Sequence, residues 1–178
     1  MTVAELCQAA IQRSDNTAAN QLLKIVGGPA AVTAYAQSLG GGAFRLDRWE
    51  TDLNTAIPGD ERDTVTPAGM GKLLQAVAVG NALLKPRRAQ LVEWLRGSIT
   101  GKNRIRAAMP ATWQIGNKTG TGDYGTANDL AIVWPPERKP IILAIYSTQK
   151  EANAKPREDL IAAAAKISLL QFERTLAY

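Results

Sequence analysis

The spacing of apolar residues changes character once along this chain, near Trp113. Beyond that point, β-rich runs cover Trp113 to Gly122, Leu130 to Trp134 and Ile141 to Tyr146, and Pro135-Pro136 separates the last two as a turn. A final segment, Lys155 to Leu176, has its apolar residues at helical spacing. Consecutive strands joined by short turns pair as an antiparallel meander, so this part predicts a three-stranded antiparallel sheet followed by one helix.

The part before Trp113 shows helical spacing almost throughout. Thr2 and Glu5 form a capping box that opens a first helix. A second helix begins near Thr17 and stops at Gly27-Gly28, and a third follows at once. Further helices are predicted from Thr66 and from Pro86, after a break in the pattern.

That break runs from about Arg45 to Thr64 and fits neither period 2 nor period 3.6. Loops of this length are uncommon in compact domains and are often functional. The chain is therefore expected to be α+β. Residues 1–110 form a helical lobe with the loop 45–64, and residues 111–178 form the meander and the closing helix.

The residue types limit the chemistry. The chain has 178 residues, no histidine and one cysteine, Cys7. This excludes Ser-His-Asp triads, Cys-His dyads and His- or Cys-built zinc sites from these residues. We expect no metal and no cofactor, and Cys7 lies on the apolar face of the first helix as a small core residue.

The formal net charge is +5, but the basic residues are spread along the chain without interleaved aromatics. A nucleic-acid surface would gather them on one face with aromatics for stacking. A solvated basic surface is the preferred interpretation. No apolar stretch approaches the roughly 18 residues of a membrane span, and the first residues do not read as a signal peptide.

Three short clusters contain residues able to do chemistry. The first is Ser14-Asp15-Asn16, at a break between helices. The second is Glu50-x-x-x-Asn54 in the long loop, between Arg48 and Asp63. The third is Lys118-Thr119-Gly120, on a glycine-rich strand. Each motif alone is a common structural feature, but their order and spacing are specific.

Together the three clusters resemble the C-terminal part of a class A serine β-lactamase, and most closely the extended-spectrum, cefotaxime-hydrolysing members. The resemblance extends from Thr2 to about Phe172 and includes Arg48-Trp49-Glu50 and Asn54-Thr55-Ala56-Ile57-Pro58. It implies the β-lactamase/transpeptidase-like fold, a helical lobe beside an antiparallel sheet flanked by helices, with the N-terminal part missing.

The resemblance also implies roles for individual residues in hydrolysis of penicillins and cephalosporins through a serine acyl-enzyme. Ser14 would relay a proton, Glu50 would activate water, and Lys118 would supply positive charge for the substrate carboxylate. The Thr121 backbone N–H would be one oxyanion donor. The implied substrate-binding residues are Asn16, Asn54, Arg104, Thr119, Gly120 and Thr121.

The pair Glu50 and Asn54 separates two branches of this superfamily. A penicillin-binding transpeptidase deacylates slowly, whereas a β-lactamase must release the acyl group to water. A glutamate that activates that water favours the β-lactamase. The base that takes the proton of the nucleophile during acylation is left open, because it could be this glutamate or the lysine of the nucleophile motif. By resemblance, an ion pair between Arg48 and Asp63 should pin the loop.

The nucleophile motif Ser-x-x-Lys should precede Ser14, but only thirteen residues do. The string Ser147-Thr148-Gln149-Lys150 comes after Lys118-Thr119-Gly120, so we interpret it as a decoy. The chain itself is expected to be inactive, as a truncated product or as a part that works only when complemented. A missing nucleophile helix and two missing strands would also leave it aggregation-prone or molten.

Three further points depend on the resemblance. Thr51 stands where many relatives carry a proline after a cis peptide, which leaves the position of Glu50 open. Arg104 matches one position from which the family supplies an arginine to the substrate carboxylate; a plain surface arginine is the alternative. Cys7 matches a position that forms a disulfide in some members.

The parent is expected to be monomeric and periplasmic or secreted, without nucleic-acid or membrane partners.

Overall fold

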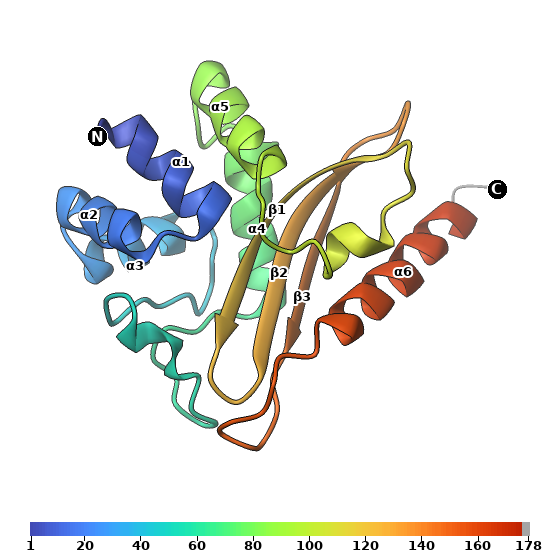
Figure 1. Ribbon diagram of the computed structural model, residues 1–178. Helices are drawn as coiled ribbons and strands as arrows, with labels where there is room; N and C mark the ends of the chain where they lie inside the picture. The colour runs from blue at the N-terminus through green and yellow to red at the C-terminus, as the bar shows by residue number, and fades with distance from the viewer. Residues whose placement is uncertain (176–178) are drawn as a thin grey trace.

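A computed structural model describes the backbone of residues 1–175 and the side chains through residue 172. Six α-helices, two short 3-10 helices and three strands follow each other along this part of the chain (Figure 1). Their order is α1 (Val3–Arg13), α2 (Asn16–Val26), α3 (Pro29–Ser38), η1 (Asp52–Thr55), α4 (Pro67–Ala78), α5 (Lys85–Arg96), η2 (Ile105–Ala108), β1 (Gln114–Gly122), β2 (Thr126–Trp134), β3 (Ile141–Ser147) and α6 (Glu158–Thr175).

The strands form one antiparallel sheet in the order β1-β2-β3, which confirms the predicted meander. β2 begins at Thr126, four residues before the predicted Leu130. Ala127 and Asp129 are both fully buried, so the face of β2 that carries their side chains points into the core. The apolar pattern of the sequence does not show the start of this strand, because the buried carboxylate of Asp129 occupies a core position.

Helices cover both faces of the sheet. On one face α6 and η2 pack over a cluster that includes Ile105, Val133, Leu143 and Ile161. On the other face α4 and α5 pack over a second cluster built around Leu74, Leu95 and Ile132. The α+β prediction is confirmed, and the division into two parts at residue 110 stays a prediction.

Local sequence signals explain most helix ends. The Thr2–Glu5 capping box is present at the start of α1. α2 ends at Gly27, which has a positive φ. α6 begins at Glu158, three residues later than predicted at Lys155. Pro156 lies in between, and the residue before a proline avoids helical geometry.

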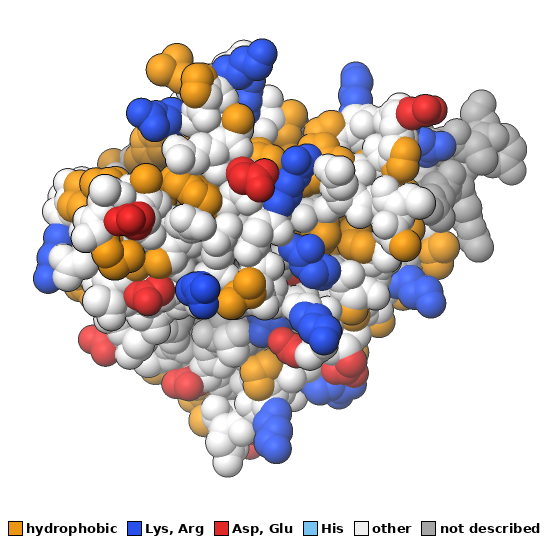
Figure 2. All heavy atoms as spheres, turned by 45° about the horizontal axis from the view of Figure 1, so that its top comes forward, with side chains coloured by type: hydrophobic (Ala, Val, Ile, Leu, Met, Phe, Trp, Pro, Cys, Tyr) orange, Lys and Arg blue, Asp and Glu red, His pale blue; other side chains and the backbone are white. Residues whose placement is uncertain are grey.

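The N-terminal helix is only loosely covered, because no residue of α1 is fully buried. On the face drawn in Figure 2, Lys and Arg side chains are scattered among acidic and apolar ones. None of the helices in the described residues has the length and apolar character needed to cross a membrane.

Candidate active site

Ser14 occupies the junction between α1 and α2, in the left-handed region with φ 54°. The next residue, Asp15, is the N-cap of α2, and its carboxylate accepts a hydrogen bond from the Ala18 backbone at 2.8 Å. Asn16 is the first residue of α2. The predicted break at Ser-Asp-Asn is therefore a tight connection between two helices that turns Ser14 toward the sheet.

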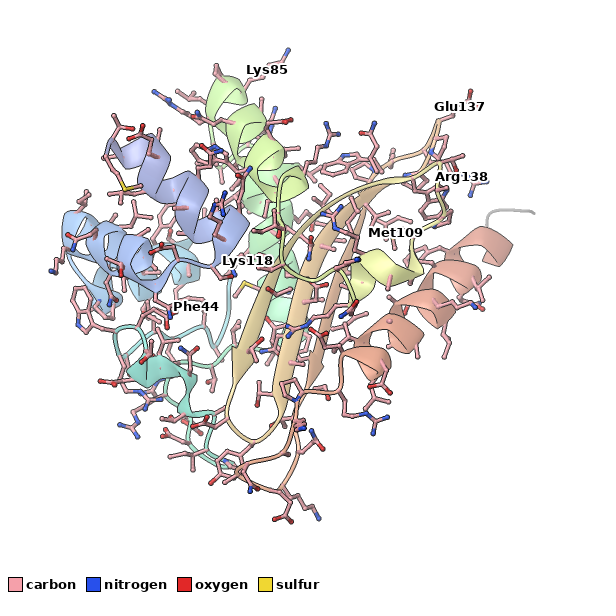
Figure 3. All side chains as sticks on the ribbon, in the orientation of Figure 1. Phe44, Lys85, Met109, Lys118, Glu137 and Arg138 are labelled. Carbon is pink, nitrogen blue, oxygen red and sulfur yellow. The ribbon has the colours of Figure 1, made fainter. Side chains whose placement is uncertain are left out.

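Lys118 extends from β1 to this junction (Figure 3). Its ammonium donates to the Ser14 hydroxyl and to the Thr119 carbonyl, each at 2.5 Å. Partial burial lowers the pKa of Lys118. The negative charges of Glu50 and Asp129 raise this pKa and partly offset the effect of burial, whereas the positive charge of Arg104 lowers it further. A cation thus lies between the helical part and the sheet, against a hydroxyl that can pass on a proton.

The carboxylate of Glu50 is fixed by Asn54, whose amide nitrogen donates to it at 2.6 Å. The backbone of Glu50 is held from another element. The Asn20 side chain on α2 accepts from the Glu50 N–H at 3.0 Å and donates to the Glu50 carbonyl at 2.8 Å. The peptide between Glu50 and Thr51 is cis. The position of Glu50 is therefore determined on both its side chain and its backbone.

The predicted ion pair that pins the loop is present, with Arg48 Nε 2.6 Å from the Asp63 carboxylate. The Asp63 carboxylate also accepts the backbone N–H groups of Asp47 and Arg48, at 2.6 and 2.9 Å. Asp47 accepts the Asp63 N–H in return, at 3.0 Å. From Arg48 a further bond reaches Thr55 at the end of η1. The two ends of the loop are clasped, and the turn that carries Asn54 is tied to the clasp.

Arg104 lies behind β1, with only 4% of its surface exposed. Its guanidinium donates to the Thr121 hydroxyl at 2.7 Å, to the carbonyls of Gly120 and Asn128, and to Glu158 at 2.9 Å. The alternative of a plain surface arginine is therefore wrong. The side chain instead positions Thr121 and links the strand to the start of α6.

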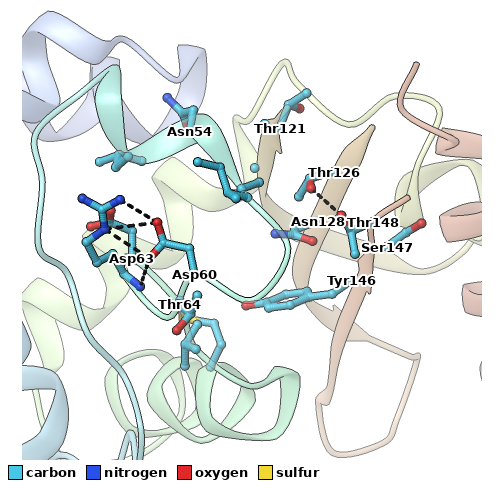
Figure 4. Close-up of a pocket in the computed structure, with 18 of the residues that line it drawn as sticks. Asn54, Asp60, Asp63, Thr64, Thr121, Thr126, Asn128, Tyr146, Ser147 and Thr148 are labelled. Atoms are coloured by element: carbon cyan, nitrogen blue, oxygen red, sulfur yellow. Dashed lines mark hydrogen bonds and ion pairs between the residues drawn. The ribbon is translucent and has the colours of Figure 1, made fainter. Parts of the chain in front are cut away.

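A cavity of about 560 Å³ opens between the loop 45–64 and the three strands of the sheet (Figure 4). The predicted site residues among its lining are Asn54, Lys118, Thr119, Gly120 and Thr121. Ser14, Asn16, Glu50 and Arg104 lie outside this lining. Ser147 also lines this cavity, and no hydrogen bond joins it to Lys150 in the described residues. Its interpretation as a decoy stays a prediction.

The acidic side chains were also compared with the arrangement that a metal ion needs. Across the described residues, no three His, Cys, Asp or Glu side chains are placed to hold an ion. The buried carboxylate of Asp129 is occupied structurally, because it accepts from Asn117 at 2.9 Å and from the Ile105 N–H at 3.0 Å. Burial raises the pKa of Asp129, and these hydrogen bonds act in the opposite direction.

Comparison with known proteins decides the family. The model of the Beta-lactamase enzyme family matches residues 1–172. The chain belongs to the class A β-lactamases. It is 57% identical to a β-lactamase of Citrobacter koseri and 56% identical to the carbapenem-hydrolysing β-lactamase KPC of Klebsiella oxytoca, over 94% and 95% of its length.

The solved structure of a β-lactamase from Desulfarculus baarsii DSM 2075 superimposes on this β-lactamase chain with a TM-score of 0.95 and 55% identity, over 97% of the chain. The chain spans 57% and 58% of the length of the two curated relatives and 64% of that solved structure. The resemblance and the fold inferred from the sequence are thus both confirmed.

Sequence reasoning missed two groups that hold this site together. Asn20 lies in the interior of α2, where asparagine is a poor helix former, and that mismatch was the available signal. Thr100 accepts a hydrogen bond from Thr119 at 2.8 Å, and nothing in its local sequence pointed to the strand. The approach is possible because Gly101, with φ +79°, has no Cβ to collide with Asn117 and Thr119.

Proposed function

We propose that this chain carries the substrate-binding and deacylating groups of a β-lactamase that opens penicillins and cephalosporins through a serine acyl-enzyme. The observation that carries the proposal is the double fixation of Glu50, by Asn54 on its carboxylate and by Asn20 on its backbone. A carboxylate held in this way can act as a general base on a water molecule. The nucleophile would come from a Ser-x-x-Lys motif outside these 178 residues.

The residues of β1 would bind the β-lactam substrate next to its ring. Lys118 and the hydroxyls of Thr119 and Thr121 would bind the substrate carboxylate, with Arg104 holding Thr121 from behind. Asn16 would bond the side-chain amide of the substrate, and the lack of a side chain at Gly120 would let the ligand approach the strand closely. The Thr121 N–H would donate to the developing oxyanion.

Proton transfer would follow the observed contacts. In acylation, the serine gives its hydroxyl proton to a general base as its oxygen forms a bond to the lactam carbonyl carbon, and the carbon–nitrogen bond breaks. The nitrogen takes a proton from Ser14, Lys118 replaces that proton on Ser14, and the proton held by the general base restores the Lys118 ammonium. In deacylation, a water oxygen attacks the acyl carbon, Glu50 takes a proton from that water, and the serine oxygen leaves and takes this proton back from Glu50. Water is the only co-reactant.

The experiment uses this chain co-expressed with the part of the Citrobacter koseri relative that lies outside the match, hereafter the complemented protein. We expect nitrocefin hydrolysis by the complemented protein and none by the chain alone. Hydrolysis by the pure chain that disappears in Ser147→Ala would show that the decoy is the nucleophile. A folded complemented protein without turnover would refute the proposal.

Other functions fit less well. In a penicillin-binding transpeptidase the acyl-enzyme persists, and the Glu50–Asn54 contact argues against such slow release. An inactive product remains the alternative for the chain on its own. For the longer parent we propose a monomer in the periplasm or secreted, with β-lactams as its ligands and no cofactor.

A further inference from the structure

A ladder of polar contacts joins the segment 98–106, which follows α5 and ends within η2, to one face of β1. Side chains two positions apart on a strand point to the same face of the sheet. Three such residues of β1 are bonded to the segment, each to a different partner: Asn117 to Arg106, Thr119 to Thr100, and Thr121 to Arg104. The segment therefore supports the face of β1 that carries the hydroxyls of Thr119 and Thr121.

The middle contact of this ladder continues into a chain of three hydroxyls, those of Ser98, Thr100 and Thr119. The Thr119 hydroxyl donates to the Thr100 hydroxyl at 2.8 Å, and the Ser98 hydroxyl lies 3.2 Å from the same Thr100 oxygen. Ser98 can also donate to the Thr100 carbonyl, but only at 3.5 Å. Ser98 is buried, whereas Thr100 and Thr119 are half-buried. This hydroxyl chain thus runs from the interior to the strand that would bind the substrate.

The protons of the hydroxyl chain limit what Thr119 can do. A hydroxyl carries one proton and has two acceptor lone pairs. Thr119 uses its proton in the bond to Thr100, whereas the proposed function requires the same proton for the substrate carboxylate. Both needs are met in turn if the chain reverses, so that Thr119 donates to the carboxylate and Thr100 donates to Thr119. Ser98 permits this reversal, because either oxygen of its contact with Thr100 can be the donor.

We propose that Thr100 is a positioning residue for the substrate carboxylate, which holds the Thr119 oxygen in place and donates to it once a ligand takes the Thr119 proton. The inference rests on the proposed function, since it takes Thr119 as a ligand of the carboxylate. Hydrogen bonds that point the same way along a chain polarise one another. The reversed chain directs every donor toward the anion, which makes Thr119 a stronger donor than an isolated hydroxyl would be.

A purely structural role for Thr100 is the alternative, in which the contact only fastens the segment to β1. The other two contacts of the ladder already do this with charged groups. Arg104 donates to groups on β1, β2 and α6, and Arg106 donates to Asn117, which is itself bonded to the buried Asp129. Because these contacts keep the segment in place, loss of the Thr100 hydroxyl should affect ligand binding more than folding.

The test compares benzylpenicillin with its methyl ester, which lacks the charged carboxylate, in the complemented protein. Both compete with nitrocefin, so the ester gives an inhibition constant even without turnover. Thr100→Val removes the hydroxyl and keeps the branched shape. We expect it to raise KM for benzylpenicillin by about fivefold while kcat and the inhibition constant of the ester stay within about twofold of wild type. Thr100→Ser, which keeps the hydroxyl, should restore KM.

Two further variants complete the test. Thr112→Val, at an exposed loop threonine, is the matched control and should change the binding of neither compound. Ser98→Ala keeps Thr100 and removes only the hydroxyl behind it. It should raise KM for benzylpenicillin by about twofold and leave the ester unchanged. Urea unfolding checks that each variant folds, and Ser98→Ala decides the question where Thr100→Val does not.

Three results would overturn the inference. Equal changes for acid and ester would mean that Thr100 only shapes the site, and an unchanged KM would mean that Thr119 does not depend on it. A lower KM for benzylpenicillin would mean that Thr100 competes with the substrate for the Thr119 proton. The proposed function fails differently: absence of nitrocefin turnover by the wild-type complemented protein refutes it together with the inference, whereas turnover with any of the three results overturns the inference alone.

Discussion

The ammonium nitrogen of Lys118 lies 2.5 Å from the hydroxyl oxygen of Ser14, although 104 positions separate the two residues in the sequence. This contact joins the helical part to the sheet. In the proposed function it lies where the ring nitrogen of the substrate would receive its proton. It brings together two of the three motifs on which the family resemblance is based, Ser-Asp-Asn and Lys-Thr-Gly.

Ser14→Gly tests the proton relay. Glycine tolerates the left-handed backbone at this position, so the variant removes the hydroxyl without adding strain. We expect acylation of the complemented protein to slow by about 100-fold or more, with little change in folding. Stopped-flow nitrocefin kinetics measure this, and the exposed Ser38→Gly serves as the control. An unchanged acylation rate would remove Ser14 from the relay.

Asn20→Ala tests whether the backbone clasp positions Glu50. The substitution removes both hydrogen bonds to the Glu50 backbone. A displacement of about 1 Å at a reacting group can cost on the order of 100-fold in rate, so deacylation should slow by about that factor while acylation changes less. Asn81→Ala, an exposed loop asparagine, is the matched control. Equal loss in both steps would indicate general unfolding instead.

Asp63→Ala tests the clasp of the loop. The Asp63 side chain is 2% exposed, and its loss leaves Arg48 and two backbone N–H groups without their acceptor. Removing one partner of a buried pair costs about 3 kcal/mol. Urea unfolding and proteolysis within residues 45–64 of the complemented protein should both show it. Asp159→Ala, which breaks an exposed pair with Arg157, should change the free energy of unfolding by under about 1 kcal/mol.

Lys118 should leave a signature in the pH dependence of stability. Burial lowers its pKa in the folded state below the ordinary 10.5. At pH values between the folded and the unfolded pKa of Lys118, the unfolded chain binds more protons than the folded chain does. The free energy of unfolding therefore rises with pH across that interval. Lys118→Met should remove this rise, whereas the exposed Lys72→Met should keep it. Urea titrations from pH 7 to about 10.5 measure both, and identical slopes would contradict the shift.

The sequence predicts those parts of this molecule that depend on local rules. The Thr2–Glu5 box, the glycine stop at Gly27 and the meander follow from caps, turns and periodicity. The early start of β2 does not, because Asp129 is buried only through bonds to Asn117 and Ile105, which are distant in sequence.

The site shows the same division. The three motifs could be found by their order and spacing, and the family resemblance that they support implied the Arg48–Asp63 pair. The clasp of Asn20 on Glu50, at a separation of 30 positions, and the bond of Thr100 to Thr119 could not. Such contacts depend on how elements pack, and a single helix or loop contains no periodic signal for them.

The most direct test of the account is the mass of the complemented protein after mixing with a penicillin. Wild type should show only a transient acyl adduct. Glu50→Ala should accumulate it on the serine of the supplied Ser-x-x-Lys motif, because no base remains to activate water. The exposed Glu93→Ala should behave as wild type. Turnover of Glu50→Ala at the wild-type rate, or an adduct on Ser147, would contradict the account.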